Sequence, residues 1–297
     1  MRCSILVLAG LTACAAVFAE DKTQDLSFDE VVWAKTVVTP YDDSSKEARD
    51  ETYKVYTHLM DFAGKEPITK GGGGQYPHHR GLFIGWRETT VGGKKFDTWH
   101  MTDCYQQFTG KMKLDRGPER DIQTLGIEWN GNDGTPIFNE QRTISIQAGA
   151  AGIRIVDFTS VLTSDADVTL RGDSHHAGMQ VRLSNELAEH PELASYVLPE
   201  GAQMLKNDEV SGAWWAVCNA KIGGKDYGIM HMTPPDNPTG IKLYSIRPYA
   251  RFGAFFEPDV KKGVPLTLTY RIVVSESPID QAKAEMLYQE YASGHTK

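Results

Sequence analysis

Strict alternation of apolar and polar residues most limits how this chain can fold. Between Leu266 and Val274 every second residue is large and apolar, and Thr267, Thr269 and Arg271 stand between them. A period of two is the pattern of a β-strand with one buried face, because successive side chains of a strand point to opposite sides. The segment therefore predicts a half-buried strand.

The same pattern recurs along most of the chain. Residues 143–146 and 153–162 alternate on either side of the small-residue turn 148–152, which predicts a hairpin, and 179–183 predicts a further strand. Shorter extended runs are expected at Val31–Val38, Tyr53–Met60, Leu125–Trp129, Trp214–Cys218, Tyr227–Met232 and Tyr244–Tyr249. Many strands with Gly and Pro turns predict a sandwich or a barrel. We expect a single all-β domain over residues 30–295.

One helix is expected, near the C-terminus. Ser277 supplies a cap, Pro278 stands in the first turn and Asp280 at the third position, before apolar residues at helical spacing up to Tyr291. Residues 185–200 could hold another short helix. The prediction is thus an antiparallel β-sandwich with a C-terminal helix.

The N-terminus has the pattern of an export signal. Arg2 is followed by an apolar stretch, and small residues at Val17 and Ala19 predict cleavage after residue 19. Residues 11–14 also fit a bacterial lipobox, which would leave a lipid anchor on Cys14. In either case we expect a periplasmic or extracellular protein.

Charge and hydropathy exclude several partners. The chain has 31 basic and 39 acidic residues, so its formal net charge is −8, and no basic surface for nucleic acid is implied. Beyond the N-terminus no apolar run approaches the roughly 20 residues of a spanning helix, so an integral membrane protein is not expected. Cys104 and Cys218 could pair in an oxidising compartment, but the sequence does not place them within bonding distance.

Histidine is the informative residue type for function. Four of the nine histidines form two adjacent pairs, His78-His79 and His175-His176. Neighbours in a strand point to opposite faces, so at most one histidine of each pair would enter a shared pocket, unless the pair lies in a loop. Four histidines near Arg, Asp and Gln exceed what core packing requires, and the pairs predict a functional site.

Three further segments carry polar groups that fit such a pocket. Asp97 precedes His100 by three residues and could orient its imidazole. Gln180 and Arg182 would share a strand face with His176. Tyr249 and Arg251 share another face, and Glu257 ends that run. The tryptophans at 86, 99, 129, 214 and 215 are interpreted as core.

Four sequence words together resemble a known family. They are residues 76–86 (YPHHRGLFIGW), 97–100 (DTWH), 176–182 (HAGMQVR) and 247–253 (RPYARFG). In this order they resemble a secreted bacterial family of unknown function, common in planctomycetes and Bacteroidetes and once labelled "methane oxygenase PmoA". That label does not fit a chain without membrane helices. The resemblance implies a secreted polysaccharide-utilisation protein, and the all-β pattern is similar to the galactose-mutarotase-like super-sandwich.

Three functions follow as hypotheses. The first is a carbohydrate-active enzyme, lyase-like, hydrolytic or epimerising, on a glycoside or oligosaccharide. His79 or His176 would be the general acid or base, and Tyr249 or Glu257 the second proton-transfer group. The expected substrate-binding residues are His78, Arg80, Asp97, His100, His175, Gln180, Arg182 and Arg251. The motifs offer His and Arg more readily than the paired carboxyls of a conventional glycosidase, which favours lyase-like or metal-assisted chemistry.

The other two hypotheses differ in class. A non-catalytic sugar-binding protein would keep its binding without His79 and His176. A metal-binding protein, for example a copper redox protein, would use His78, His79, His100 and His176, because imidazoles suit divalent metals. The spacing matches no compact metal motif, so the cofactor is unknown and a divalent metal is one possibility.

Overall fold

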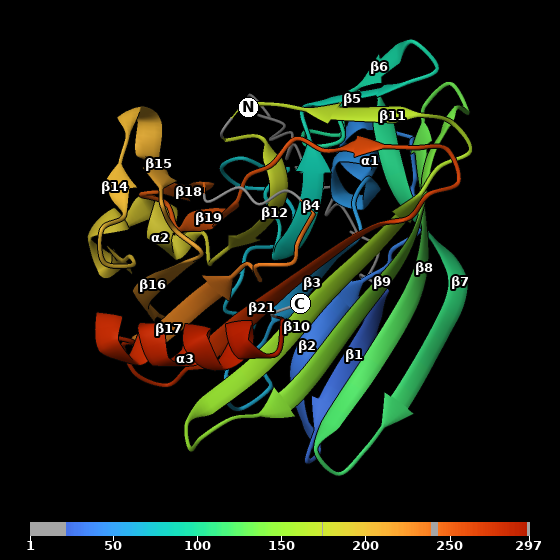
Figure 1. Ribbon diagram of the computed structural model, residues 1–297. Helices are drawn as coiled ribbons and strands as arrows, with labels where there is room; N and C mark the ends of the chain where they lie inside the picture. Colours follow the sequence, from blue (N-terminus) through green and yellow to red (C-terminus); the bar gives the residue numbers. More distant parts are fainter. Residues whose placement is uncertain (1–21, 174, 239–242, 296–297) are drawn as a thin grey trace, which may run out of the picture.

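The computed structural model describes residues 22–173, 175–238 and 243–295. In that part of the chain the strands form three antiparallel sheets (Figure 1). The expected signal peptide over residues 1–19 and the lipobox at Cys14 lie outside the described residues.

The largest sheet has nine strands among the described residues. In spatial order they are β1 (Thr23–Phe28), β2 (Val31–Val37), β3 (Tyr56–Leu59), β4 (Leu82–Trp86), β12 (Ala177–Arg182), β19 (Arg251–Ala254), β18 (Leu243–Arg247), β15 (Glu209–Ser211) and β14 (Gln203–Met204). Strands β4, β12 and β19 therefore lie side by side although they are far apart in the sequence.

The second sheet has eight described strands, several of them long and strongly curved (Figure 1). Their order is β13 (Ala194–Val197), β16 (Trp215–Ile222), β17 (Lys225–Met232), β21 (Leu266–Ser275), β10 (Ile153–Thr163), β9 (Pro136–Ala148), β8 (Arg120–Gly131) and β7 (Cys104–Arg116). A small third sheet joins β20 (Asp259–Val260), β11 (Val168–Arg171), β5 (Glu88–Val91) and β6 (Lys94–Phe96).

The main core lies between the two large sheets. Leu82 and Trp86 of β4 and Phe158 and Leu268 from the opposite sheet are buried in one cluster. The predicted hairpin of β9 and β10 and the predicted strand β21 are confirmed, since β10 pairs with both neighbours in antiparallel register. The prediction of an antiparallel β-sandwich with a C-terminal helix is confirmed.

The C-terminal helix α3 (Gln281–Ser293) covers the outer face of the second sheet (Figure 1). It starts later than predicted, because Asp280 is its N-cap and its carboxylate accepts the N–H of Lys283. The backbone of Ile279 is bonded instead to the side chain of Asn219, which holds this buried residue outside the helix. The cap predicted at Ser277 is therefore wrong by one turn.

Two short helices complete the described chain. Helix α1 (Lys46–Thr52) was not predicted, and α2 (Glu186–Glu189) confirms a short helix within 185–200, followed by a 3-10 turn at Pro191–Leu193. Another 3-10 turn lies at Lys206–Asp208. Cys104 and Cys218 are buried free thiols. Among the described residues, no helix has the length and apolarity that crossing a bilayer requires.

Candidate functional site

The outer face of the nine-stranded sheet carries the polar side chains that the sequence singles out. On β4, β12 and β19, Leu82, Ile84, Val181 and Phe252 belong to the main core. Alternate residues point the other way, and Phe83 there forms a separate buried cluster with Trp99. Phe83 is aligned with Gln180 across the β4–β12 pair, and Arg182 with Arg251 across the β12–β19 pair.

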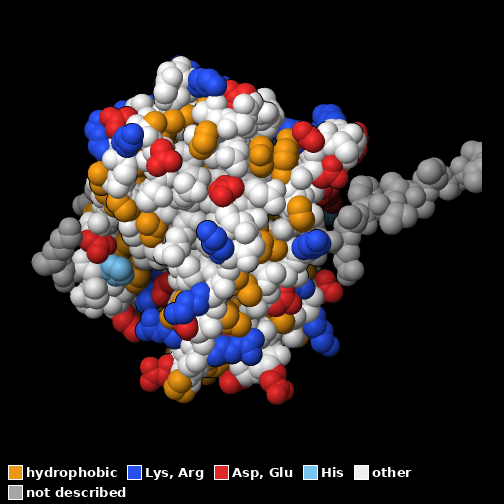
Figure 2. Space-filling view, turned by 90° about the vertical axis from the view of Figure 1, so that its right-hand side faces the viewer, with side chains coloured by type: hydrophobic (Ala, Val, Ile, Leu, Met, Phe, Trp, Pro, Cys, Tyr) orange, Lys and Arg blue, Asp and Glu red, His pale blue; other side chains and the backbone are white. Residues whose placement is uncertain are grey.

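Loops bring five histidines together above this face. We call His78, His79, His100, His175 and His176 the histidine cluster. The ring centres of His78 lie 4.2 Å from His79 and 4.4 Å from His100, and His100 lies 5.1 Å from His176. His175 follows at 6.3 Å from His176. By contrast, the side of the molecule seen in Figure 2 mixes acidic and basic side chains and shows a single histidine patch.

Both members of each histidine pair enter the cluster, which is the arrangement expected when a pair lies in a loop. The reason is that neither pair lies in a strand: residues 78–79 precede β4, and residues 175–176 precede β12. The loop of residues 97–100, which carries His100, packs closely against β4. A Cβ on Gly85 would lie 2.3 Å from the carbonyl oxygen of Thr98, so only glycine lets the 97–100 turn lie flat on β4.

Two histidines are oriented by carboxylates at the same spacing. The Nδ1 atom of His100 lies 2.8 Å from Asp97 Oδ2, and that of His176 lies 2.6 Å from Asp173 Oδ1. Each aspartate also accepts backbone N–H groups of its own turn. With Nδ1–H donated to a carboxylate, the Nε2 atom keeps its lone pair, and among the described residues neither Nε2 has a hydrogen-bond partner.

The electrostatics keep both aspartates ionised and His176 neutral. Burial alone would raise the pKa of Asp97 and of Asp173, but hydrogen bonds from their turns and from the paired histidines lower it below the usual value. Burial lowers the pKa of His176, and Asp173 only partly opposes this. His176 is therefore a neutral imidazole at neutral pH, held by an ionised carboxylate and about a quarter exposed.

His79 forms the buried floor of the cluster. It is 2% exposed, packs against Phe83, Trp99 and Tyr249, and neither ring nitrogen has a hydrogen-bond partner in the described chain. Burial, together with neighbouring positive charge, holds the pKa of His79 far below the ordinary value. Burial also lowers the pKa of His78 to about 2.

Four cations lie buried around this floor without a carboxylate partner among the described residues. Arg182 and Arg251 are at most 1% exposed, and their guanidinium groups lie over the rings of Tyr249 and Trp99, at 4.9 and 5.5 Å. Lys54 and Lys70 bond only to backbone carbonyl groups. Burial and the nearby arginines lower the pKa of Lys70 to about 7, and burial lowers that of Arg182 to about 10. Burial also lowers the pKa of Lys54 well below its usual value. Arg182 therefore stays charged at neutral pH, whereas Lys70 is only partly protonated.

Gln180 and His175, two of the expected substrate-binding residues, take part in the hydrogen bonds around Arg251. Gln180 is fully buried, and its Oε1 accepts a hydrogen bond from Arg251 at 3.0 Å. His175 Nδ1 lies 3.1 Å from Ser245 Oγ, which also accepts from Arg251. These side chains position the arginine rather than line an open surface.

Two expected residues are not brought into the cluster. The guanidinium of Arg80 is fully buried and donates to the carbonyl oxygens of Asp50, Glu51 and Pro77, so it fastens the loop before β4 to α1. Glu257 is exposed, and its carboxylate accepts the N–H of Gly172.

Sequence reasoning missed Asp173, Lys54, Lys70 and Tyr76 as members of the site. One signal for Asp173 was present: it precedes His176 by three residues, as Asp97 precedes His100. Tyr76 is 40% exposed and packs on Tyr249 at 4.8 Å. As for a metal, no group of three or more His, Cys, Asp or Glu side chains in the described part of the chain has an arrangement that could hold one.

The fold and the site define a class: an antiparallel β-sheet protein with a site rich in histidine and buried arginine on the outer face of one sheet. The chain belongs to DUF6807, a family of unknown function, whose model matches residues 30–289. The resemblance to a family of unknown function is thereby confirmed. No curated protein matches the sequence.

Several solved structures align with most of the chain at low similarity. A mutant of the heparan sulfate lyase HepC from Pedobacter heparinus aligns with 10% identity and a TM-score of 0.39, over 86% of this chain and 35% of that one. The chain thus spans about a third of the length of that lyase. A GalM/aldose epimerase homologue from C. elegans aligns with 10% identity and a TM-score of 0.36, over 86% of this chain and 98% of that one.

Proposed function

We propose that this protein is an acid–base catalyst acting on an acidic sugar, and that its reaction begins with removal of a proton from the carbon next to the sugar carboxylate. The observation that carries the proposal is the presence of two neighbouring His–Asp pairs. The ring centres of His100 and His176 lie 5.1 Å apart, near buried arginines that have no carboxylate partner in the described chain.

Charge selects the ligand. Each unpaired buried cation is costly unless an anion approaches it, and a cluster of them raises the local concentration of negatively charged ligands. The carboxylates nearest the cluster, Asp97 and Asp173, already accept hydrogen bonds from histidines and their own turns. A uronate carboxylate held at the mouth of the cluster would supply the missing negative charge.

The residues then divide into roles. His176, neutral and partly exposed, takes the proton from the carbon next to the carboxylate through Nε2. In an elimination the electron pair of that C–H bond forms a carbon–carbon double bond, and the glycosidic carbon–oxygen bond breaks. The leaving oxygen receives a proton from Tyr249, which lies beside Arg182 and His79. His100 is the second base candidate, and the buried arginines stabilise the negative charge that develops.

Purified full-length protein incubated with uronate-containing oligosaccharides in D2O, followed by NMR, tests this. Wild type should form an unsaturated sugar or exchange the proton next to the carboxylate, and His100→Gln and His176→Gln should lose this while still binding the oligosaccharide. His190→Gln, a change at an exposed histidine, is the control. Binding without turnover or exchange by wild type would contradict catalysis and favour a binding protein. Loss of turnover on chelation, restored by a metal, would favour the metalloprotein alternative.

A further inference from the structure

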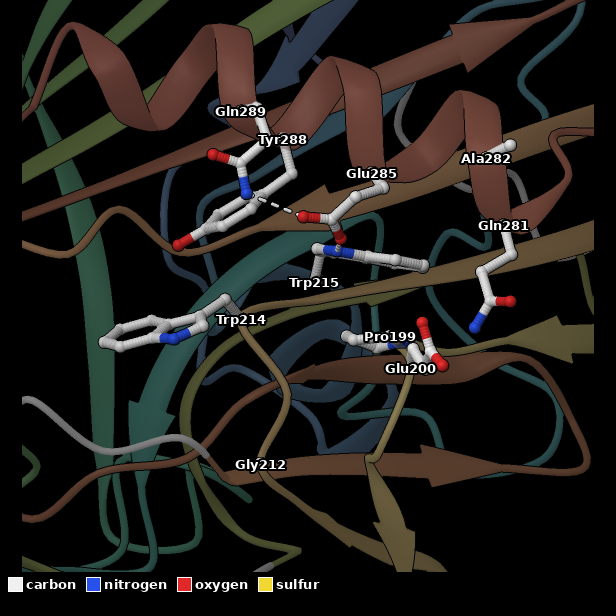
Figure 3. A pocket seen from close by; sticks show the side chains of 10 residues that line it. All are labelled: Pro199, Glu200, Gly212, Trp214, Trp215, Gln281, Ala282, Glu285, Tyr288 and Gln289. Carbon is white, nitrogen blue, oxygen red and sulfur yellow. Dashed lines mark hydrogen bonds between the residues drawn. The ribbon is translucent and has the colours of Figure 1, made fainter.

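The groove beside helix α3 has no unsatisfied buried polar group among its described lining residues (Figure 3). Glu285 there accepts hydrogen bonds from Trp215 Nε1 at 3.1 Å and from Gln289 Nε2 at 2.6 Å. That groove therefore gives no reason to infer a ligand. Unsatisfied buried nitrogens are found instead under the loop of residues 70–81, which carries His78 and His79.

Arg182 lies at the base of this loop with donors that no described residue satisfies. Its side chain is fully buried, Nε and Nη1 have no hydrogen-bond partner in the described chain, and Nη2 reaches only Asn185 Oδ1 at 3.5 Å. Burial lowers the pKa of Arg182 to about 10, so the guanidinium stays charged at neutral pH. A buried cation without a counter-ion is costly, and an anion that reached it would remove that cost.

Two packed tyrosine rings cover Arg182. The ring centre of Tyr249 lies 4.9 Å from the guanidinium carbon, and the ring of Tyr76 packs on Tyr249 at 4.8 Å between centres. Tyr76 is itself 40% exposed. His79, whose two ring nitrogens are also unpartnered in the described chain, lies 5.5 Å from Tyr76. Displacement of Tyr76 would therefore open a way to Arg182 and His79 together.

The segment that carries Tyr76 is fixed on both sides and loose between them. The ammonium of Lys70 and the guanidinium of Arg80 hold carbonyl groups before and after it. Neither Gly74 nor Gln75 makes a hydrogen bond to another described residue. Tyr76 has a φ of +54°, which is unfavourable for a residue other than glycine. A loose, strained segment over unsatisfied groups has the properties of a lid.

We propose that Arg182 is the anchor of a carboxylate-binding subsite, and that residues 74–76 are the lid that moves when an acidic sugar reaches it. A carboxylate fits because its two oxygens accept hydrogen bonds from a guanidinium, and the rings of Tyr76 and Tyr249 offer faces to the sugar. The inference rests on the proposed function for the identity of the ligand, and its tests measure binding, not turnover.

Isothermal titration of the full-length protein tests the subsite. Trisaccharides of galacturonate, glucuronate and mannuronate are compared with those of galactose, glucose and mannose. Wild type should bind at least one acidic trisaccharide more tightly than its neutral counterpart. Arg182→Met should reduce that affinity about tenfold or more and abolish the preference, without lowering the urea midpoint, because it removes a buried charge that has no counter-ion.

Two further variants keep this test sharp. Arg182→Lys retains a positive charge and should keep part of the preference for the acidic trisaccharide. Arg116→Met, at an exposed arginine of β7, is the matched control and should bind as wild type does.

A disulfide tests the lid. A Cβ on Gly74 would lie 3.4 Å from the Cγ atom of Asn185, which is close enough for cysteines at the two positions to be joined. Oxidation of the double variant Gly74→Cys, Asn185→Cys should reduce its affinity for the acidic trisaccharide about tenfold or more, and reduction should restore it. The reduced form is the control for loss of the Asn185 amide.

Three results would overturn the inference: no binding of any acidic trisaccharide by wild type, unchanged affinity in Arg182→Met, or equal affinity of the oxidised and reduced double variant. Binding that depends on Arg182 and on an open lid, without turnover or proton exchange, would support the subsite while contradicting the proposed reaction. Turnover by wild type with unchanged affinity in Arg182→Met would do the reverse.

Discussion

Replacing His79 by Phe should make the protein less sensitive to acid. His79 is buried between Phe83, Trp99 and Tyr249 with both ring nitrogens unpartnered, so a phenyl ring fits the apolar slot. Removing an unsatisfied buried polar group gains about 1–3 kcal/mol, and the slightly larger ring costs a similar amount by overpacking. Near neutral pH we therefore expect little net change in the free energy of unfolding.

The free energies of unfolding of wild type and His79→Phe should differ at acidic pH. Burial holds the pKa of folded His79 far below its ordinary value, whereas in the unfolded chain the imidazole titrates near its reference pKa of about 6.5. As pH falls below that value, the unfolded state gains a proton that the folded state does not bind, so stability is lost. Between about pH 7.5 and about pH 5 this one group costs wild type about 2 kcal/mol, and the variant escapes that loss.

Urea unfolding at the two pH values, followed by tryptophan fluorescence, measures the difference. His190→Phe at an exposed site is the control and should keep the pH sensitivity of wild type. The reasoning is refuted if His79→Phe and wild type lose the same free energy between the two pH values, because His79 would then protonate in the folded state.

Three further predictions concern the site and its support. Asp173→Asn should reduce turnover of an acidic sugar about a hundredfold while leaving its affinity nearly unchanged, since the amide N–H₂ can donate to Nδ1 of His176 and leave the ring proton on Nε2, where the base needs its lone pair; steady-state kinetics would separate the two effects. Glu140→Gln should lower the free energy of unfolding by about 3 kcal/mol, because it strands the fully buried Arg142, and urea titration would show it. Gly85→Ala should destabilise the protein by about 1–3 kcal/mol and weaken catalysis together, since its Cβ would meet a backbone oxygen at 2.3 Å.

How much of the fold could be predicted depended on whether local pattern or tertiary contact decided each element. Period-two alternation reports directly which face of a strand is buried, and β21 follows it from Leu266 onward. The start of α3 does not follow local signals, because the side chain of Asn219, sixty residues away, holds Ile279 in place. No cap pattern in the sequence around Ser277 contains that contact.

The candidate site, too, could be predicted where local motifs decide it and not where tertiary contacts do. The histidines, Tyr249 and the strand arginines could be named from their motifs, because those motifs place polar groups next to buried strands. Strand parity does not apply to the histidine pairs, since the N–H of His79 bonds to the carbonyl oxygen of Tyr76 and that of His175 to Asp173, which form turns instead of strands there. Burial of Lys54 and Lys70 could not be foreseen, because ordinary lysines are exposed and only the packed loops supply the carbonyl groups that hold them.

The hydrogen bonds that the carboxylates of this site already accept argue against a conventional glycosidase. Such an enzyme requires two carboxyl groups flanking the scissile bond, one of them free to act as nucleophile or base. Here Asp97 and Asp173 each accept a histidine Nδ1–H, and Glu257 accepts the N–H of Gly172, so these three carboxylates are already engaged. Among the described residues of the site, the imidazole of His176 and the phenol of Tyr249 are the groups that we propose move a proton, and buried arginines lie beside them. Those groups suit proton removal next to a carboxylate, where the enzyme must stabilise negative charge, better than hydrolysis, where it must stabilise a developing positive charge on the sugar ring.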